Sequence, residues 1–282
     1  MGTRTTIFGR STQRAAIAAV AVSAAAVLAA PTASASTLDN IPGAEFCDGT
    51  LTGSCVNVDV LSGMFNNNGF QLPLRQGDMV LSLGLTDDGA YVSDAENGWG
   101  VHSKPVTVPG GVLGVDLPLN NLFGLAAVTA EVEGVGLPVM HDQIFDFNID
   151  LPVRMKINNP FLGDKCYIGS PDKPVTFELR GVNPGTANPP VYEVLGEPDY
   201  PAETLKISNV QAAAADFALP SASGCGPFGV LNPIVNWRAK LPATQNTSLT
   251  TEAEAYLFSP GDLVATPSPE TPGAGSSGSS GS

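Results

Sequence analysis

Four cysteines are the residues whose type and spacing indicate the clearest chemistry in this chain. Cys47 and Cys55 lie eight positions apart, and Cys166 and Cys225 lie fifty-nine positions apart. An even number of cysteines in an exported protein is typical of disulfide bonds. Three pairings are possible and the sequence does not choose among them, but the spacing favours Cys47 with Cys55 and Cys166 with Cys225.

The other reactive residue types give little support for metal binding or catalysis. Zinc sites need clustered cysteines or histidines, yet the chain has no C-x-x-C pair, and its two histidines, His102 and His141, are isolated in the sequence. A serine hydrolase would need one of these histidines as its base, and no serine after residue 35 lies in a G-x-S-x-G turn. We therefore predict no catalytic residue, no metal ligand and no cofactor.

Two aromatic residues are candidate ligand contacts. Trp99 lies between two glycines and is expected to be exposed, and an exposed ring of this kind can stack on a sugar. Tyr167 follows Cys166 directly and is expected to pack on the disulfide. For both residues, packing within the fold is the alternative to ligand binding.

The charge of the chain excludes one class of partner. The sequence has 27 acidic and 13 basic residues, a formal charge of −14 and a pI near 4.3. A nucleic-acid surface must be basic to displace counterions from phosphates, so nucleic-acid binding is not expected. High negative charge instead favours solubility.

The first 35 residues have the pattern of a secretory signal peptide. Three arginines precede an alanine-rich run over residues 15–30, and Ala33-Ser34-Ala35 forms an A-x-A cleavage site. A transmembrane anchor fits less well, because the run is shorter than the ~20 apolar residues of a span. We therefore expect a secreted protein, extracellular or at the cell surface, with no stable transmembrane helix in the mature chain.

Alternating apolar residues predict that strands position these side chains. The clearest run is Phe145–Ile157, where apolar residues take every second position, and Pro152 within it indicates an edge strand or a bulge. Turn pairs such as Asn68-Gly69 and Asp88-Gly89 separate the candidate strands. Shorter runs predict strands at 56–61, 79–85, 105–108, 127–133, 175–180, 191–195, 204–210, 217–219 and 249–257. In the last of these, the side chains expected to face inward are Leu249, Thr251, Ala253, Ala255 and Leu257.

These patterns predict an all-β fold, an antiparallel β-sandwich or open barrel that is stapled by disulfides and has at most one short helix. That helix is expected over Pro233–Lys240, with Asn232 as its N-cap. After the signal peptide at 1–35, we expect an N-terminal β region at 36–140 and a C-terminal β region at 141–264, as one domain or two. Residues 265–282 are rich in Pro, Ser and Gly, which is typical of a disordered tail.

Three stretches of the second half contain recognisable motifs: NPFLGDKCYIGS (Asn159–Ser170), ASGCG (Ala222–Gly226) and LNPIVN (Leu231–Asn236). Together they resemble a family of secreted actinobacterial proteins of unknown function, with Cys-Tyr-Ile-Gly and Gly-Cys-Gly loops, over roughly residues 145–260. The resemblance implies that Cys166 and Cys225 are the family's paired cysteines. It transfers no catalytic residue.

We therefore expect a secreted, non-catalytic protein that binds a ligand or has a structural role outside the cell or on its envelope. The alternative is a β-barrel component of a mycolate-type outer membrane, because Phe145–Ile157 alternates over the ~9–11 residues of a spanning strand. A secreted hydrolase that uses His102 or His141 is third. The sequence identifies neither the ligand, the partner nor the oligomeric state.

Overall fold

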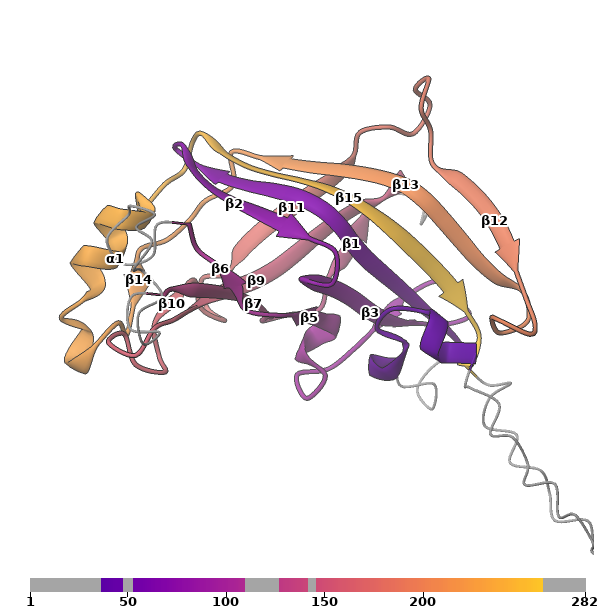
Figure 1. Ribbon diagram of the computed structural model, residues 1–282, viewed down its shortest axis with the longest axis horizontal. Coiled ribbons are helices and arrows are strands. Elements are labelled where there is room, and N and C mark those ends of the chain that lie inside the picture. The colour runs from indigo at the N-terminus through magenta and orange to yellow at the C-terminus, as the bar shows by residue number, and fades with distance from the viewer. Residues whose placement is uncertain (1–36, 48–52, 110–126, 142–145, 261–282) are drawn as a thin grey trace, which may run out of the picture. The chain divides into compact units, whose positions relative to one another are not determined.

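A computed structural model describes residues 37–47, 53–109, 127–141 and 146–260 of the chain (Figure 1). These residues all belong to one compact unit. They form one curled antiparallel sheet with a single α-helix, which confirms the predicted fold class. The expected signal peptide, Phe145 and the expected tail lie outside the described residues. Within them, no helix is both long and apolar enough to span a membrane.

The elements of the described residues are named here in chain order. The strands are β1 (Ser54–Asn67), β2 (Phe70–Arg75), β3 (Met79–Leu85), β4 (Tyr91–Val92), β5 (Val101–Ser103), β6 (Val106–Thr107), β7 (Thr129–Gly134), β8 (Val139–His141), β9 (Asn148–Asn158), β10 (Tyr167–Ile168), β11 (Val175–Gly181), β12 (Val191–Leu195), β13 (Thr204–Ala215), β14 (Ala222–Ser223) and β15 (Thr247–Phe258). The helix α1 spans Asn232–Ala239, and 3-10 turns are η1 (Thr37–Asn40), η2 (Ala44–Phe46), η3 (Gly98–Gly100) and η6 (Pro227–Gly229).

The sheet curls so strongly that β5 and β7, at the two ends of its pairing order, are joined by side-chain hydrogen bonds. From β7, the pairing order passes through β9, β11, β13, β15, β1 and β3 to β5. The Ser103 hydroxyl on β5 donates to the carbonyl of Val132 on β7 at 2.9 Å and accepts that residue's N–H at 2.7 Å. The fold is therefore an open barrel whose seam is bridged by Ser103, and both halves of the sequence contribute strands to it.

The long strand predicted around Pro152 is β9, and it lies in the interior of the sheet. β11 pairs with one side of β9, with no register shift at Pro152, and β7 and β8 pair with the other side. The predicted edge or bulge is therefore wrong. Pairing with β8 reaches only Asp150 and pairing with β7 begins at Val153, so neither strand needs an N–H from Pro152, whose carbonyl accepts the N–H of Val135 at 3.1 Å.

Two other predicted strands differ from the structure, and one hairpin strand was missed. The residues predicted as a strand at 217–219 form only an isolated bridge, between Leu219 and Ala243. The hairpin strand β2 was not among the predicted strands. On β15 the predicted inward alternation holds as far as Ala255, but Tyr256 and Phe258 are also buried, because residues of η1 and η2 cover the outer face there.

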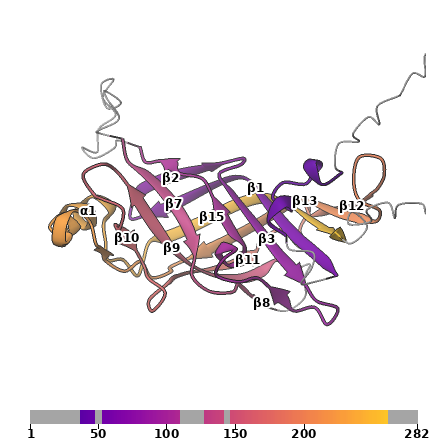
Figure 2. The ribbon, with the colours of Figure 1, turned by 90° about the horizontal axis from the view of Figure 1, so that it is seen from below.

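Both disulfides pair as the spacing favours, Cys47 with Cys55 and Cys166 with Cys225. The first joins the segment after η2 to β1. The second joins the loop before β10 to the loop before η6, at the end of the sheet where α1 lies (Figures 1 and 2). The space inside the curled sheet is filled by the main core, which includes a contact cluster of Phe65, Phe177 and Phe217 with ring centroids 4.9–6.5 Å apart.

Candidate functional site: an apolar cavity beneath the helix

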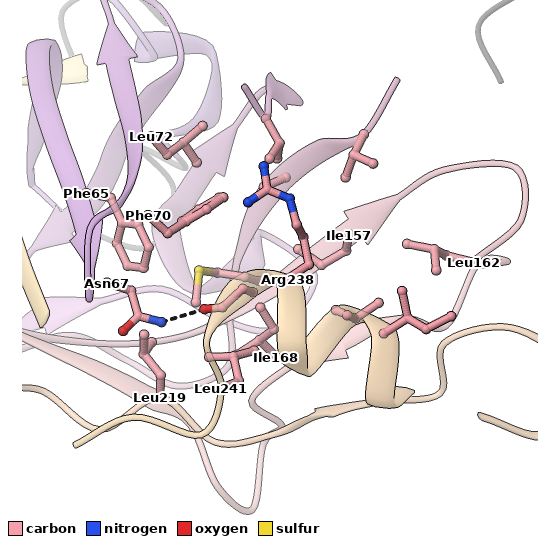
Figure 3. A pocket seen from close by; sticks show the side chains of 17 residues that line it. Phe65, Asn67, Phe70, Leu72, Ile157, Leu162, Ile168, Leu219, Arg238 and Leu241 are labelled. Atoms are coloured by element: carbon pink, nitrogen blue, oxygen red, sulfur yellow. Dashed lines mark hydrogen bonds between the residues drawn. The ribbon is translucent and has the colours of Figure 1, made fainter. Parts of the chain in front are cut away.

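An apolar cavity of about 100 Å³ lies between α1 and the strands β2, β7 and β9 (Figure 3). Its volume compares with the ~150 Å³ apolar cavity that stays dry and holds benzene in an engineered protein. Two of the lining side chains, Asn67 and Arg238, are polar. The others are Phe65, Phe70, Leu72, Val108, Val128, Ala130, Met155, Ile157, Leu162, Ile168, Leu219, Ile234, Val235, Ala239 and Leu241.

Asn67 at the end of β1 fixes the C-terminal end of α1 over the cavity. Its Nδ2 donates to the carbonyl of Ala239 at 2.7 Å and to that of Lys240 at 3.3 Å. These carbonyls belong to the last turn of the helix, which has no partner of its own for them. The Asn67 amide is therefore a structural contact, although it forms part of the wall.

The disulfide corner fixes the N-terminal end of the helix. Asn232 Oδ1 accepts the N–H of Cys225 at 2.8 Å, and Asn236 Oδ1 accepts the N–H of Ala222 at 2.7 Å. The predicted role of Asn232 as N-cap is wrong. The helix begins at Asn232 after Leu231, without a side-chain cap, because the Asn232 side chain is used to hold the cysteine loop.

Arg238 is the charged residue of the cavity wall. Its guanidinium extends from α1 toward β2 (Figure 3), where Cζ lies 5.6 Å from the centre of the Phe70 ring. Nη2 donates to the carbonyl of Pro109 at 3.1 Å, but Nε is buried and has no hydrogen-bond partner among the described residues. A buried donor left unpaired costs about 1–3 kcal/mol, so an oxygen acceptor on a bound molecule would stabilise this side chain.

Two further internal spaces lie farther along the inside of the sheet. A void of about 40 Å³ shares Phe65, Leu72, Ala130 and Met155 with it, and a second cavity of about 100 Å³ lies beyond Met79. Methionine is unbranched and adaptable, so a change of the Met155 rotamer would connect the first cavity with the smaller void. Met155 is therefore the adaptable side chain in the wall that the two spaces share.

The second cavity is also apolar and includes Tyr91 in its wall. Burial raises the pKa of Tyr91 to about 12, so this phenol stays neutral at physiological pH. Neither cavity gathers the paired acid and base that general acid–base catalysis needs. Both cavities can bind an apolar molecule, and in the first one the Arg238 guanidinium can contact a polar group of that molecule.

The predicted ligand contacts Trp99 and Tyr167 lie outside the walls of these cavities. Trp99 is half-buried, and Gly134 of β7 packs so closely on it that a Cβ there would lie 3.2 Å from the Trp99 Cβ. The Tyr167 ring contacts the Arg154 guanidinium, with Cζ 4.2 Å from the ring centre. Ile168, the next residue, faces the cavity instead, as alternation along a strand requires.

The two histidines are not brought together with each other or with a serine at hydrogen-bond distance in the described residues. His141 Nε2 lies 2.7 Å from Asp150 Oδ2, and Arg180 Nη1 lies 2.8 Å from Asp150 Oδ1. Burial acts to raise the pKa of Asp150, but the hydrogen bonds from His141 and Arg180 outweigh it and lower this pKa. The cluster is a half-exposed ion pair of Asp150 and Arg180, joined by a hydrogen-bonded His141, on the outer surface of β8, β9 and β11. Among the described residues, no group of three His, Cys, Asp or Glu could hold a metal ion.

His102 is half-buried and stacks on Phe46, with ring centroids 3.7 Å apart, and its buried Nε2 has no hydrogen-bond partner in the described ranges. Burial lowers its pKa, and the charge of Glu45 opposes this only partly. Below the unfolded-state pKa of ~6.5, the unfolded chain binds a proton that the folded one does not.

We therefore expect the free energy of unfolding to fall as the pH drops below ~6.5, and His102→Phe to remove this part of the decrease. Urea unfolding of both proteins between neutral and mildly acidic pH measures the difference between them. That difference should grow as the pH falls. A difference that is the same at every pH would show that His102 does not titrate in this way.

Two features of the site were not among the sequence predictions. Phe70, Leu72 and Leu74 alternate directly after the Asn68-Gly69 turn, so β2 could have been found from the hairpin rule. The direction of Arg238 could not, because its helix is short and its exposed and buried faces differ little in hydrophobicity. Only the packing of α1 against the sheet decides which side chains enter the cavity.

In comparisons with known proteins, no family model, curated protein or solved structure matches the chain. The resemblance to secreted actinobacterial proteins therefore stays a prediction.

Proposed function

We propose that the protein is a secreted, non-catalytic binding protein whose ligand is an aliphatic chain with an oxygen-bearing head, such as a carboxylate. The observation on which this depends is the cavity beneath α1, which is apolar except for Asn67 and Arg238. Asn67 is already used by the helix, so Arg238 is the group available for a ligand. Two disulfides and the signal-like first 35 residues support a role outside the cell.

The chemistry of the wall defines the ligand class. Moving an alkyl chain of the ligand from water to contact with these apolar side chains is favourable by about 0.8 kcal/mol for each buried CH₂ group. The Arg238 guanidinium prefers an anionic oxygen, because charge-assisted hydrogen bonds are roughly twice as strong as neutral ones. A medium-length fatty acid has both features, and its tail would extend toward Met155.

Calorimetric titration with sodium decanoate tests this function. Ala130 lines the cavity from β7, and Ala130→Leu places extra carbon atoms where the chain would lie. We expect this variant to bind decanoate about tenfold more weakly, with a heat-capacity change on binding that is less negative than in the wild type. Circular dichroism checks that the variant folds, because overpacking costs about 1–3 kcal/mol.

Ala212→Leu is the matched control. Ala212 is as buried as Ala130, but it lines the second cavity and not the one beneath α1. Decanoate affinity should be unchanged in this variant. No heat of binding to the wild type, or an equal loss in both variants, would contradict the proposed site.

A further inference from the structure

The outer side of η6 and α1 exposes several large apolar side chains close together. Phe228 is fully exposed and Trp237 is 80% exposed. Large contiguous apolar patches are rare on soluble monomers and mark surfaces that meet a partner or a membrane. We call this surface the apolar corner, and its residues are Phe161, Phe228, Val230, Ile234 and Trp237.

Three of these residues form a stripe on α1 and the turn before it. Val230 has a helical backbone, and Ile234 and Trp237 follow it at spacings of four and three. Side chains at these spacings lie on the same helix face. Val230 and Trp237 therefore point outward, and Ile234, which is 52% exposed, lies at the rim of the cavity that Val235 and Arg238 line from the same helix.

The two phenylalanines extend the stripe across the disulfide corner. Phe161 and Phe228 line the same surface hollow, between the loop before β10 and η6. These loops are joined by the Cys166–Cys225 disulfide and by the Gly226 N–H, which donates to the carbonyl of Leu162 at 2.7 Å. Phe228 also has a left-handed backbone, with φ of 55°, which is unfavourable for a bulky residue. The fold thus holds its most exposed ring in water on a cross-linked base.

The charge pattern of this region differs from that of the rest of the chain. Between Asp216 and Glu252 the sequence has no acidic residue, although the chain has 27, and it has Arg238 and Lys240 there. Lys165 adds a positive charge and Asp164 a negative one in the neighbouring loop. At physiological ionic strength, charges beyond ~8 Å are largely screened, so the local pattern decides what can approach.

A second exposed apolar patch shows the contrast. Val191, Tyr192 and Val194 of β12 are exposed at the opposite end of the sheet from α1 (Figures 1 and 2). Four acidic residues and no basic ones lie within residues 191–203. That patch would be repelled by an anionic surface, whereas the apolar corner would not.

We infer that the apolar corner is a membrane-contact surface that inserts its aromatic and aliphatic side chains into a bilayer containing anionic lipids. Phe228 and Trp237 enter the boundary between headgroups and acyl chains, and Lys165 and Lys240 lie near the headgroups. Repulsion of the acidic remainder restricts contact to this corner. The inference does not depend on what the cavity binds, although it places α1 and the cavity next to the lipid.

Trp237 provides the readout, because Trp99 is the other tryptophan of the chain. In a Trp99→Phe background, the full-length protein without added ligand is mixed with vesicles of equimolar phosphatidylcholine and phosphatidylglycerol. We expect Trp237 emission to shift to shorter wavelength and to be quenched when the phosphatidylcholine is brominated on its acyl chains. Co-sedimentation gives the partition coefficient.

Phe228→Asn is the test variant, because asparagine tolerates a left-handed backbone better than most residues and should not disturb the fold. We expect it to lower the vesicle partition coefficient about tenfold. Val230→Asn is a second variant with the same expected direction. Val194→Asn on β12, where the side chain is 73% exposed, is the matched control and should leave partition unchanged.

Several results would overturn the inference. One is the absence of both a spectral shift and quenching when vesicles are added. Another is an equal loss of vesicle partition in Phe228→Asn, Val230→Asn and Val194→Asn. Sedimentation equilibrium adds another: a dimer in the wild type that Phe228→Asn dissociates, together with no vesicle binding, would assign the corner to a second copy of the chain.

Discussion

Removal of the Cys166–Cys225 disulfide is expected to lower the free energy of unfolding by about 4 kcal/mol, because it releases a loop of 59 residues in the unfolded chain. It should also abolish decanoate binding at concentrations that saturate the wild type. The reason is local: Cys225 donates its N–H to Asn232, so the loop that this cysteine anchors also positions the start of α1. The variant is Cys166→Ala with Cys225→Ala, and urea unfolding and calorimetry are the measurements.

The other disulfide is the natural control. Cys47 and Cys55 close a loop of only 8 residues, so their replacement by alanine should cost about 2.5 kcal/mol. Their bond joins η2 to β1, outside the wall of the cavity beneath α1. Decanoate affinity should therefore survive in this variant. If both double variants lost binding equally while still folded, global loosening rather than the corner would explain the effect.

Replacement of Arg238 by leucine is expected to weaken decanoate binding by about tenfold to a hundredfold. A hydrogen bond to a charged group contributes about 1.5–3 kcal/mol, and this guanidinium is the charged group in the wall. Decanol has the same chain without the negative charge, so its affinity should fall less. Stability should change little, because the variant loses the bond to Pro109 but also removes the unpaired Nε.

Arg75→Leu controls for the change in net charge. Arg75 is exposed at the end of β2 and does not line the cavity, so its replacement should leave decanoate affinity unchanged. Calorimetry of the two variants with both ligands gives four comparisons. An Arg238 variant that binds decanoate as tightly as the wild type would place the carboxylate elsewhere.

Much of the sheet could be predicted because alternation is a local property. β3 has the predicted bounds, and β9 and β11 differ from the predicted ranges mainly at their ends. The alternation in these strands records one buried face and one exposed face, and nothing distant changes it. The spacing also favours the observed disulfide pairing, although the sequence alone leaves three pairings open.

Predictions failed where a distant segment changes the local rule. Pro152 indicates an edge when β9 is considered alone, but the change of partner from β8 to β7 leaves room for a proline inside the sheet. Tyr256 is buried on the face expected to be wet, because η1 and η2 fold over it. The cavity itself depends on a helix packed against strands from three parts of the chain, and no pattern within one of them indicates it.

The most direct test of the cavity as a binding site is to locate the ligand inside it. Protein labelled with ¹³C in its isoleucine and alanine methyl groups is mixed with decanoate, and nuclear Overhauser effects between ligand and protein are measured. We expect contacts from the alkyl-chain protons of decanoate to Ile157, Ile168 and Ala130, which line the cavity. Contacts confined to Ile149 and Ile207, which line the second cavity, or none at all, would contradict the proposed site.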